Sequence, residues 1–353
     1  MCFQISCQGA TSITAFADFL CTKLSAALRQ AVYDKTAIDI ASEMKSTLPA
    51  FNGNRSKLEN YILVYLAEKE DFEEYKRYIQ SPKYFFEDFI KQRVDDYCLD
   101  KNNPKLKSFL KNSLDSFHTL VLSAIRDSTE VTKDRSGNVS LWLDEFCRRL
   151  LQHLTLPRDD LKSIEHQEVT DIEFLKAAMS KALSPVVENL KKDFTTIDMG
   201  PFSRKPHEIL AEQLGGCWEK CPFCTALCTN TIAGHDGKHS VPFHRPRAVD
   251  GGYWHKTDNL VIEICSSLVA SDCLHILRDD RRIPYKKYWE GGSPYSDWKI
   301  TPDMSEQSYW KWFVCHFKAE IEKLHGRKFE GKGEIPPQWK YVTKDTVLSE
   351  LKD

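Results

Sequence analysis

One stretch of the chain, CPFCTALCTNTIAGHDGKHSVPFHRP at residues 221–246, constrains the fold more than any other. It carries three cysteines and three histidines, yet it is too short to enclose a hydrophobic core of its own. Thiolate and imidazole groups are the ligands that zinc prefers, and zinc binds four of them in a tetrahedron. The stretch therefore predicts a zinc site that holds the surrounding chain in shape.

The spacing of the cysteines and histidines indicates which of them bind the metal. Cys221 and Cys224 have the C-x2-C spacing of a tight turn that directs two sulfur atoms at one ion. His239 and His244 follow at H-x4-H spacing and complete the first-choice set for one structural site. Two reserve candidates, Cys228 and His235, remain open as ligands, because six residues compete for four positions.

The same spacing is typical of zinc fingers that read DNA, but Pro242 argues against that interpretation. Such fingers carry both histidines on one helix, whereas Pro242 lies between His239 and His244, lacks a backbone donor and disrupts a helix. The whole chain carries 49 basic and 51 acidic residues, so bulk charge does not draw it to a phosphate backbone. Nucleic acid is therefore not an expected partner, and a nucleic-acid sensor stays an alternative only.

A catalytic zinc would need an open coordination position and a nearby general base. His235 with Asp236, or Glu263, are candidates for that base, but the sequence does not position them. Cys265 and His275 can be written as a thiol and its base, although a buried structural cysteine is the favoured interpretation of Cys265. We therefore expect no catalytic residues, with a zinc-dependent enzyme or a module related to ubiquitin transfer as the alternative.

The distribution of residues predicts two regions and an α+β chain overall. Residues 1–200 have helical periodicity and predict an antiparallel helical bundle or stalk. Within it, Ser56 and Glu59 have the spacing of a capping box, and Pro185 is expected to kink or break its helix.

Residues 201–353 predict a small zinc-binding α+β domain. Strands are expected at 228–232 and 239–244, joined as a hairpin, and at 259–269. An amphipathic helix is expected at 305–326, closed by Gly326, and a short helix at 343–352.

No apolar run approaches the roughly 20 residues that cross a bilayer, and the first residues lack the basic leader of a secretory signal. The cysteines outside the cluster are scattered through helical sequence, which favours reduced thiols over disulfides. We expect a cytoplasmic protein that also reaches the nucleus. No phosphate-binding G-x-x-x-x-G-K-[ST] motif occurs, so we expect no GTP or other nucleotide to bind this chain.

Several long strings resemble the carboxy-terminal region of the interferon-induced very large GTPases, a family that includes the up-regulator of cell proliferation. Besides residues 221–246, they are CQGATSITAFADFL at 7–20, AVYDKTAIDIA at 31–41, FNGNRSKLE at 51–59 and YWKWFVCHFK at 309–318. The resemblance implies an interferon-induced protein of the dynamin-like GTPase group that is cytosolic and nuclear and acts in innate immunity. The nucleotide-binding domain of that family lies upstream and has no counterpart here, which implies an excised fragment or a short paralogue.

These observations predict a non-catalytic carboxy-terminal module with a structural zinc ion. It would serve assembly or partner binding, through protein partners or self-association.

Overall fold

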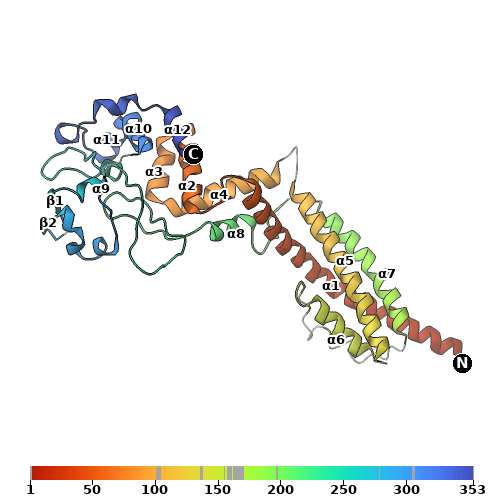
Figure 1. The fold of residues 1–353 in the computed structure, drawn as a ribbon. Coiled ribbons are helices and arrows are strands. Elements are labelled where there is room, and N and C mark those ends of the chain that lie inside the picture. Colours follow the sequence, from red (N-terminus) through yellow and green to blue (C-terminus); the bar gives the residue numbers. More distant parts are fainter. Residues whose placement is uncertain are drawn as a thin grey trace. The chain divides into compact units, whose positions relative to one another are not determined.

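A computed structural model of the chain describes residues 2–100, 105–135, 138–154, 156, 161, 171–195, 198–277, 279–303 and 307–352, with backbone only for 2–11 and 352 (Figure 1). These residues are mostly helical and contain one two-stranded sheet, which confirms the predicted α+β class. None of the helices in these ranges is both long enough and apolar enough to span a membrane.

In the described ranges, the helices before the metal-binding stretch are α1 (Cys2–Thr47), α2 (Arg55–Lys69), α3 (Phe72–Gln80), α4 (Pro82–Leu99), α5 (Lys105–Asp134), α6 (Val139–Leu150), α7 (Ile172–Asp193) and α8 (Pro206–Gln213). After it come α9 (Cys265–Leu268), strands β1 (Leu274–Ile276) and β2 (Arg282–Pro284), then α10 (Ser308–His316), α11 (Lys318–His325) and α12 (Lys344–Lys352). The strands pair antiparallel, with His275 opposite Ile283. Short 3-10 turns lie at Arg247–Asp250, Tyr285–Gly291, Tyr295–Asp297, Gly331–Gly333 and Pro337–Tyr341.

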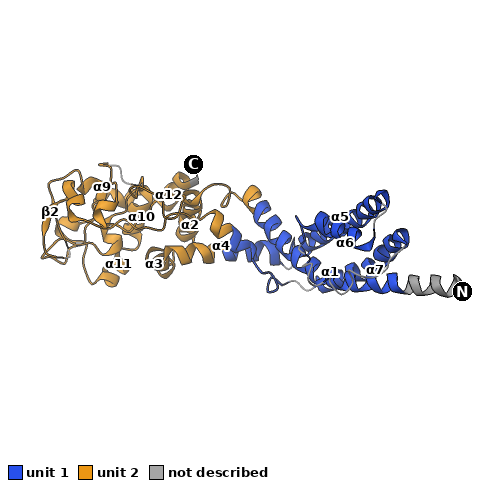
Figure 2. Ribbon diagram, turned by 90° about the horizontal axis from the view of Figure 1, so that it is seen from below, with its two compact units in different colours: residues 1–43, 91–209 blue, residues 44–90, 210–353 orange. Residues whose placement is uncertain are grey.

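The chain divides into two compact units, each made of separate sequence segments (Figure 2). Unit 1 comprises residues 1–43 and 91–209, and unit 2 comprises residues 44–90 and 210–353. This differs from the expected division at residue 200, because residues 44–90 join the carboxy-terminal segment. Burial explains the difference, since α2 packs against α12 and α3 carries aromatic side chains that contact α10.

Unit 1 is a helical bundle in which α5 packs against α6 and α7. Trp142 of α6 is fully buried, stacks on Phe146 at 5.0 Å between ring centroids, and meets Phe16 of α1 edge-on at 6.4 Å. Its indole N–H donates to Thr129 Oγ1 at 3.1 Å, so the one polar atom of this side chain is satisfied. The helices predicted for this region therefore close around an aromatic centre.

The helices of unit 2 meet through tyrosines and phenylalanines. Tyr75 of α3 packs on Phe313 of α10 at 4.6 Å, and its hydroxyl lies 2.7 Å from that of Tyr309. Tyr309 also donates to the carbonyl of Leu63 in α2 at 2.9 Å. Buried hydroxyls need partners, and here each partner comes from a distant part of the sequence. Segments 44–90 and 307–352 are thus joined by polar contacts as well as by apolar packing.

The expected strands at 228–232, 239–244 and 259–269 are wrong. Residues 228–244 approach one another, with the Thr229 N–H donating to the Ser240 carbonyl at 3.0 Å, but they form loops. These loops bring Cys228, His235 and His239 to one point and direct His244 to another. In the third segment, Cys265 begins helix α9.

Three expectations about helices also need correction, while the closing helix at α12 and Gly326 as a cap are confirmed. The helix expected at 305–326 is two helices, divided at Phe317, whose ring packs on Phe72 at 5.4 Å; residues 304–306 lie outside the described ranges. Helix α7 continues through Pro185, with Leu183 and Val187 buried on either side, so the proline does not break the helix. Asn54 caps α2 in place of Ser56, accepting from the Lys57 N–H, which leaves Glu59 free for another role.

Candidate metal centre

The C-x2-C motif forms the expected tight turn. The carbonyl of Cys221 accepts from the Thr225 N–H at 2.9 Å, and the Cys221 N–H donates to the Ala226 carbonyl at 2.8 Å. Thr225 takes a left-handed backbone conformation, with φ of 57°, which lets the chain reverse direction within a few residues. Because of this reversal, the sulfur atoms of Cys221 and Cys224 face the same point.

Four side chains converge there and are called the inner group: Cys221, Cys224, His244 and Cys265. Their ligand atoms all lie within 4.8 Å of one another, and all four residues are buried. Cys265 Sγ lies 3.8 Å from Cys221 Sγ, 3.3 Å from Cys224 Sγ and 2.7 Å from His244 Nδ1. Three thiolates and one imidazole form a complete ligand set for a structural zinc ion.

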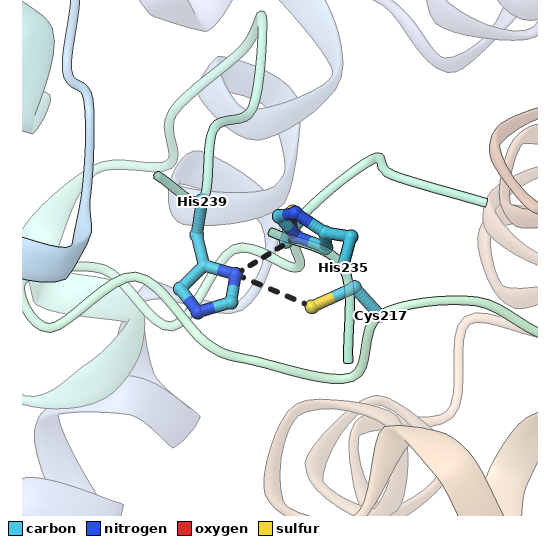
Figure 3. Close-up of side chains that lie close together, drawn as sticks. Cys217, His235 and His239 are labelled. Carbon is cyan, nitrogen blue, oxygen red and sulfur yellow. Dashed lines mark hydrogen bonds between the residues drawn. The ribbon is translucent and has the colours of Figure 1, made fainter. Parts of the chain in front are cut away.

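A second convergence, called the outer group, consists of Cys217, Cys228, His235 and His239. His239 Nδ1 lies 3.3 Å from Cys217 Sγ and 3.1 Å from His235 Nε2, the contacts drawn in Figure 3. His235 Nε2 lies 3.5 Å from Cys228 Sγ. The two cysteines are buried, whereas the two histidines are half-buried. The outer group is therefore closer to solvent than the inner group.

The structure does not bring together the four first-choice ligands of the sequence. Cys221, Cys224 and His244 share the inner group, but His239 belongs to the outer group with the reserve residues Cys228 and His235. The backbone causes this separation, because the His239 N–H donates to the Asp297 carbonyl at 2.8 Å and its carbonyl accepts from Lys299. The six candidates are thus divided three and three.

Each group is completed by a cysteine that the sequence interpretation left out. Cys217 lies four residues before the C-x2-C motif, so its proximity was a usable signal. Cys265 follows Cys224 by 41 residues, and no ligand spacing links the two. It reaches the inner group because the chain around Ile264 forms an isolated bridge with Pro246, which places the start of α9 beside His244.

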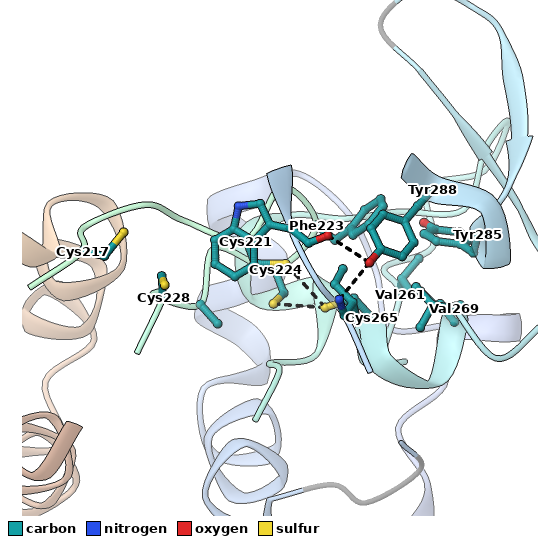
Figure 4. Close-up of a cluster of buried hydrophobic side chains, with 14 residues drawn as sticks. Cys217, Cys221, Phe223, Cys224, Cys228, Val261, Cys265, Val269, Tyr285 and Tyr288 are labelled. Atoms are coloured by element: carbon teal, nitrogen blue, oxygen red, sulfur yellow. Dashed lines mark hydrogen bonds between the residues drawn. The ribbon is translucent and has the colours of Figure 1, made fainter. Parts of the chain in front are cut away.

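The inner group sits against a cluster of buried apolar side chains that includes Phe223, Val261, Val269, Tyr285 and Tyr288 (Figure 4). Burial raises the pKa of the Cys221 and Cys265 thiols well above the ordinary value. In a metal-free chain these thiols would stay protonated at neutral pH, so a bound cation would be needed to hold them as thiolates.

Cys228 of the outer group behaves differently. Burial acts to raise its pKa, but hydrogen bonds from the backbone N–H groups of Asn230 and Ser240 and from the His239 and His235 side chains together lower the pKa to about 7. Hydrogen bonds from backbone N–H groups stabilise the charged thiolate. Cys228 is therefore prepared to act as a metal ligand near neutral pH.

A buried arginine follows His244 directly in the sequence. The Arg245 side chain is only 4% exposed and donates to Tyr78 Oη at 2.7 Å and to Glu59 Oε1 at 3.4 Å. Its guanidinium also lies over the ring of Trp310, 4.7 Å from the centroid. A buried charge needs a partner, and Glu59 of α2 supplies it.

The residues considered for catalysis have other contacts. Cys265 faces His244 in the inner group, while His275 Nε2 lies 3.1 Å from the hydroxyl of Tyr295. His235 Nδ1 lies 3.0 Å from the Asp236 backbone carbonyl, so this contact orients the ring through the main chain. The inner group has no ligand position left for a substrate among its four donors, which favours a structural role.

Fold and site together define a mostly helical chain whose unit 2 contains two Cys/His groups, the inner group and the outer group. Residues 217–351 match the family model for the carboxy-terminal domain of interferon-induced very large GTPase 1. An alignment with mouse interferon-induced very large GTPase 1 covers 100% of the chain, with 50% identity over 352 residues. The alignment with the human protein covers 99% of the chain, with 49% identity. No solved structure matches the chain.

The chain contains the carboxy-terminal domain of the interferon-induced very large GTPase family, as the resemblance in its sequence implied. It spans only 14% of the length of the curated relatives that it matches.

Proposed function

We propose that this chain is a non-catalytic carboxy-terminal module whose unit 2 is stabilised by a structural zinc ion in the inner group. The module would serve assembly in a protein of the interferon response. The observation that carries the proposal is the convergence of Cys221, Cys224, His244 and Cys265 in a fully buried set of four donors. Buried four-donor sets of this composition are typical of structural zinc and leave no position for a reacting water.

The positions of the four ligands support a stabilising role. Cys221 and Cys224 lie in one loop, His244 in the next and Cys265 at the start of α9. Unit 2 has little regular structure between α8 and α10, so hydrogen-bonded ladders contribute little to holding these loops. A metal that ties three of them together would supply folding free energy directly.

An assembly role is supported by apolar side chains on the metal-binding loops. Ile232 and Phe243 are 64% and 50% exposed, and each lies next to ligand-bearing turns. We propose that Ile232 and Phe243 contact a second copy of the chain, which would remove their apolar surface from water.

The zinc requirement is tested with Cys221→Ser/Cys224→Ser, using Cys273→Ser as the control because Cys273 is a half-buried cysteine outside both groups. We expect the double variant to lose zinc, measured by mass spectrometry, and to lose the thermal transition of unit 2, while the control retains both. Full stability of the double variant with no zinc released would refute the proposal.

The assembly role is tested separately with Ile232→Asp/Phe243→Asp in sedimentation velocity experiments. We expect this variant to keep its zinc and to shift toward the monomer relative to the unchanged chain. A chain that is monomeric at all concentrations, with or without these substitutions, would refute self-association and leave the zinc proposal standing.

A further inference from the structure

We infer that the outer group, Cys217, Cys228, His235 and His239, is a second zinc site, so that the chain binds two zinc ions through interleaved ligands. This inference extends the proposed zinc-dependent fold, but it stands on a separate set of side chains.

The separations between the donor atoms fit one ion. Zinc–sulfur bonds of about 2.3 Å and zinc–nitrogen bonds of about 2.0 Å in a tetrahedron place sulfur and nitrogen about 3.5 Å apart and two nitrogens about 3.3 Å apart. The outer group has sulfur–nitrogen separations of 3.3 and 3.5 Å and a nitrogen–nitrogen separation of 3.1 Å. The donors therefore already surround a zinc-sized space.

The surroundings of the donors are those of metal ligands. A histidine that binds zinc through one nitrogen usually donates its other N–H to a carbonyl or carboxylate, which fixes the tautomer. His235 has its Nδ1 3.0 Å from the Asp236 carbonyl, so Nε2 is the nitrogen free to bind. Cys228 accepts hydrogen bonds from the backbone N–H groups of Asn230 and Ser240, which orient its sulfur atom. These contacts hold the donor atoms of His235 and Cys228 toward the same space.

A buried positive charge next to the outer group supports the same conclusion. Arg55 of α2 is fully buried, donates to the Cys228 carbonyl and lies over the ring of Trp218 at 5.2 Å. Its Nε and Nη1 atoms have no hydrogen-bond partner, and no carboxylate pairs with it in the described part of the chain. An unpaired buried guanidinium is costly, and a thiolate at Cys228, whose carbonyl Arg55 contacts, would supply negative charge near it.

The order of the ligands along the chain links the two sites. The inner pair Cys221 and Cys224 lies between the outer ligands Cys217 and Cys228, and both outer histidines precede the inner His244. Each site therefore closes a loop that contains part of the other. Zinc binding at one site would lower the loop-closure entropy cost of bringing the ligands of the other site together, so we expect the two ions to bind cooperatively during folding.

The test uses the full chain, refolded with zinc and dialysed, and counts metal by mass spectrometry. We expect two zinc ions in the unchanged chain and in His255→Ala, a control because His255 lies outside both groups. We expect one zinc ion in His235→Ala/His239→Ala, and two in His239→Cys, because a thiolate replaces the lost imidazole.

Cobalt substitution supplies a second readout. Sulfur-to-cobalt absorption scales roughly with the number of cobalt–sulfur bonds, and two of the five cysteine ligands belong to the outer group. We therefore expect the absorption to fall by about two fifths in His235→Ala/His239→Ala.

The failures of the two proposals are distinguishable. Two zinc ions retained in His235→Ala/His239→Ala would overturn the second site. If the unchanged chain holds a single zinc ion, and that ion survives His235→Ala/His239→Ala but is lost in Cys221→Ser/Cys224→Ser, the second site is overturned while the proposed function stays intact. A chain with no zinc at all would overturn both.

Discussion

The buried pair of Glu59 and Arg245 gives the sharpest test of how unit 2 is held together. The Glu59 side chain is 15% exposed and that of Arg245 is 4% exposed, and Tyr78 Oη bonds to both. Replacing Glu59 by Ala leaves the guanidinium buried without a carboxylate. Breaking a buried pair in this way costs about 3–5 kcal/mol. We expect about 3 kcal/mol here, because Tyr78 still accepts from Arg245 and Glu59 retains some contact with solvent.

A double-mutant cycle separates the pair from its surroundings. Arg245→Met keeps an apolar chain between the rings of Tyr78 and Trp310 and removes the charge. If Glu59 stabilises the chain through Arg245, then Glu59→Ala should cost much less in the Arg245→Met background. We expect a coupling free energy of about 2 kcal/mol.

The assay is urea unfolding of unit 2 at saturating zinc, with Glu74→Ala as the matched control. Glu74 pairs with Arg77 at 2.9 Å, but Arg77 is 53% exposed, so this change should cost less than about 1 kcal/mol. Equal costs for Glu59→Ala and Glu74→Ala, or strictly additive effects in the cycle, would refute the reasoning.

Four further outcomes are expected. Trp142→Ala should lower the free energy of unfolding of unit 1 by about 3–5 kcal/mol in urea titrations, because a fully buried ring is lost, and a cost below about 1 kcal/mol would contradict this. Gly333→Ala should destabilise unit 2 by about 2–3 kcal/mol, because the new Cβ would lie 1.9 Å from the Leu260 carbonyl oxygen. In the control Gly234→Ala, the new Cβ meets no atom within 4 Å, so this change should cost only about 1 kcal/mol, for the positive φ of Gly234. A chelator should remove zinc in two phases, and the fast phase should be absent from His235→Ala/His239→Ala, because the outer histidines are half-buried while the inner ligands are fully buried. Burial lowers the pKa of His275 to about 4, whereas the unfolded chain binds this proton near pH 6.5. The contribution of His275 to stability is therefore complete above pH 6.5 and is lost as the pH falls toward 4. His275→Phe should reduce this pH-dependent loss of stability by about 2 kcal/mol, and an unchanged pH profile of stability would count against the prediction.

The sequence revealed the helices and the metal-binding stretch because both are encoded locally. Helical periodicity and the C-x2-C turn depend on neighbours within a few residues, so α12 and the turn at Cys221 were predictable. Cys265 was not, because it reaches the inner group through a bridge between Ile264 and Pro246. The division of the histidines was hidden for the same reason, since contacts with Asp297 and Lys299 direct His239 away from His244.

The strands failed for a different reason. Residues 228–232 and 239–244 contain β-forming side chains on either side of a glycine-containing turn signal, so the local pattern alone favours a hairpin. The loops instead bring Cys228, His235 and His239 to one place, and this grouping with Cys217 is not encoded in the local pattern. Likewise, the residues around Glu59 in the sequence do not predict that Glu59 pairs with Arg245 instead of capping its own helix.

Unit 2 is built from two separate sequence segments, and this limits which gene segment could be transferred to another protein as a folding unit. The stretch that the family model covers, 217–351, contains all eight metal-ligand candidates, yet residues 44–90 supply the partners of its buried charges and hydroxyls. A gene rearrangement that moved 217–351 alone into another protein would carry Arg245 without Glu59 and Tyr309 without Tyr75. The portable segment is therefore longer than the stretch that carries the chemistry, and it must include the helices of residues 44–90, which lie between the two sequence segments of unit 1.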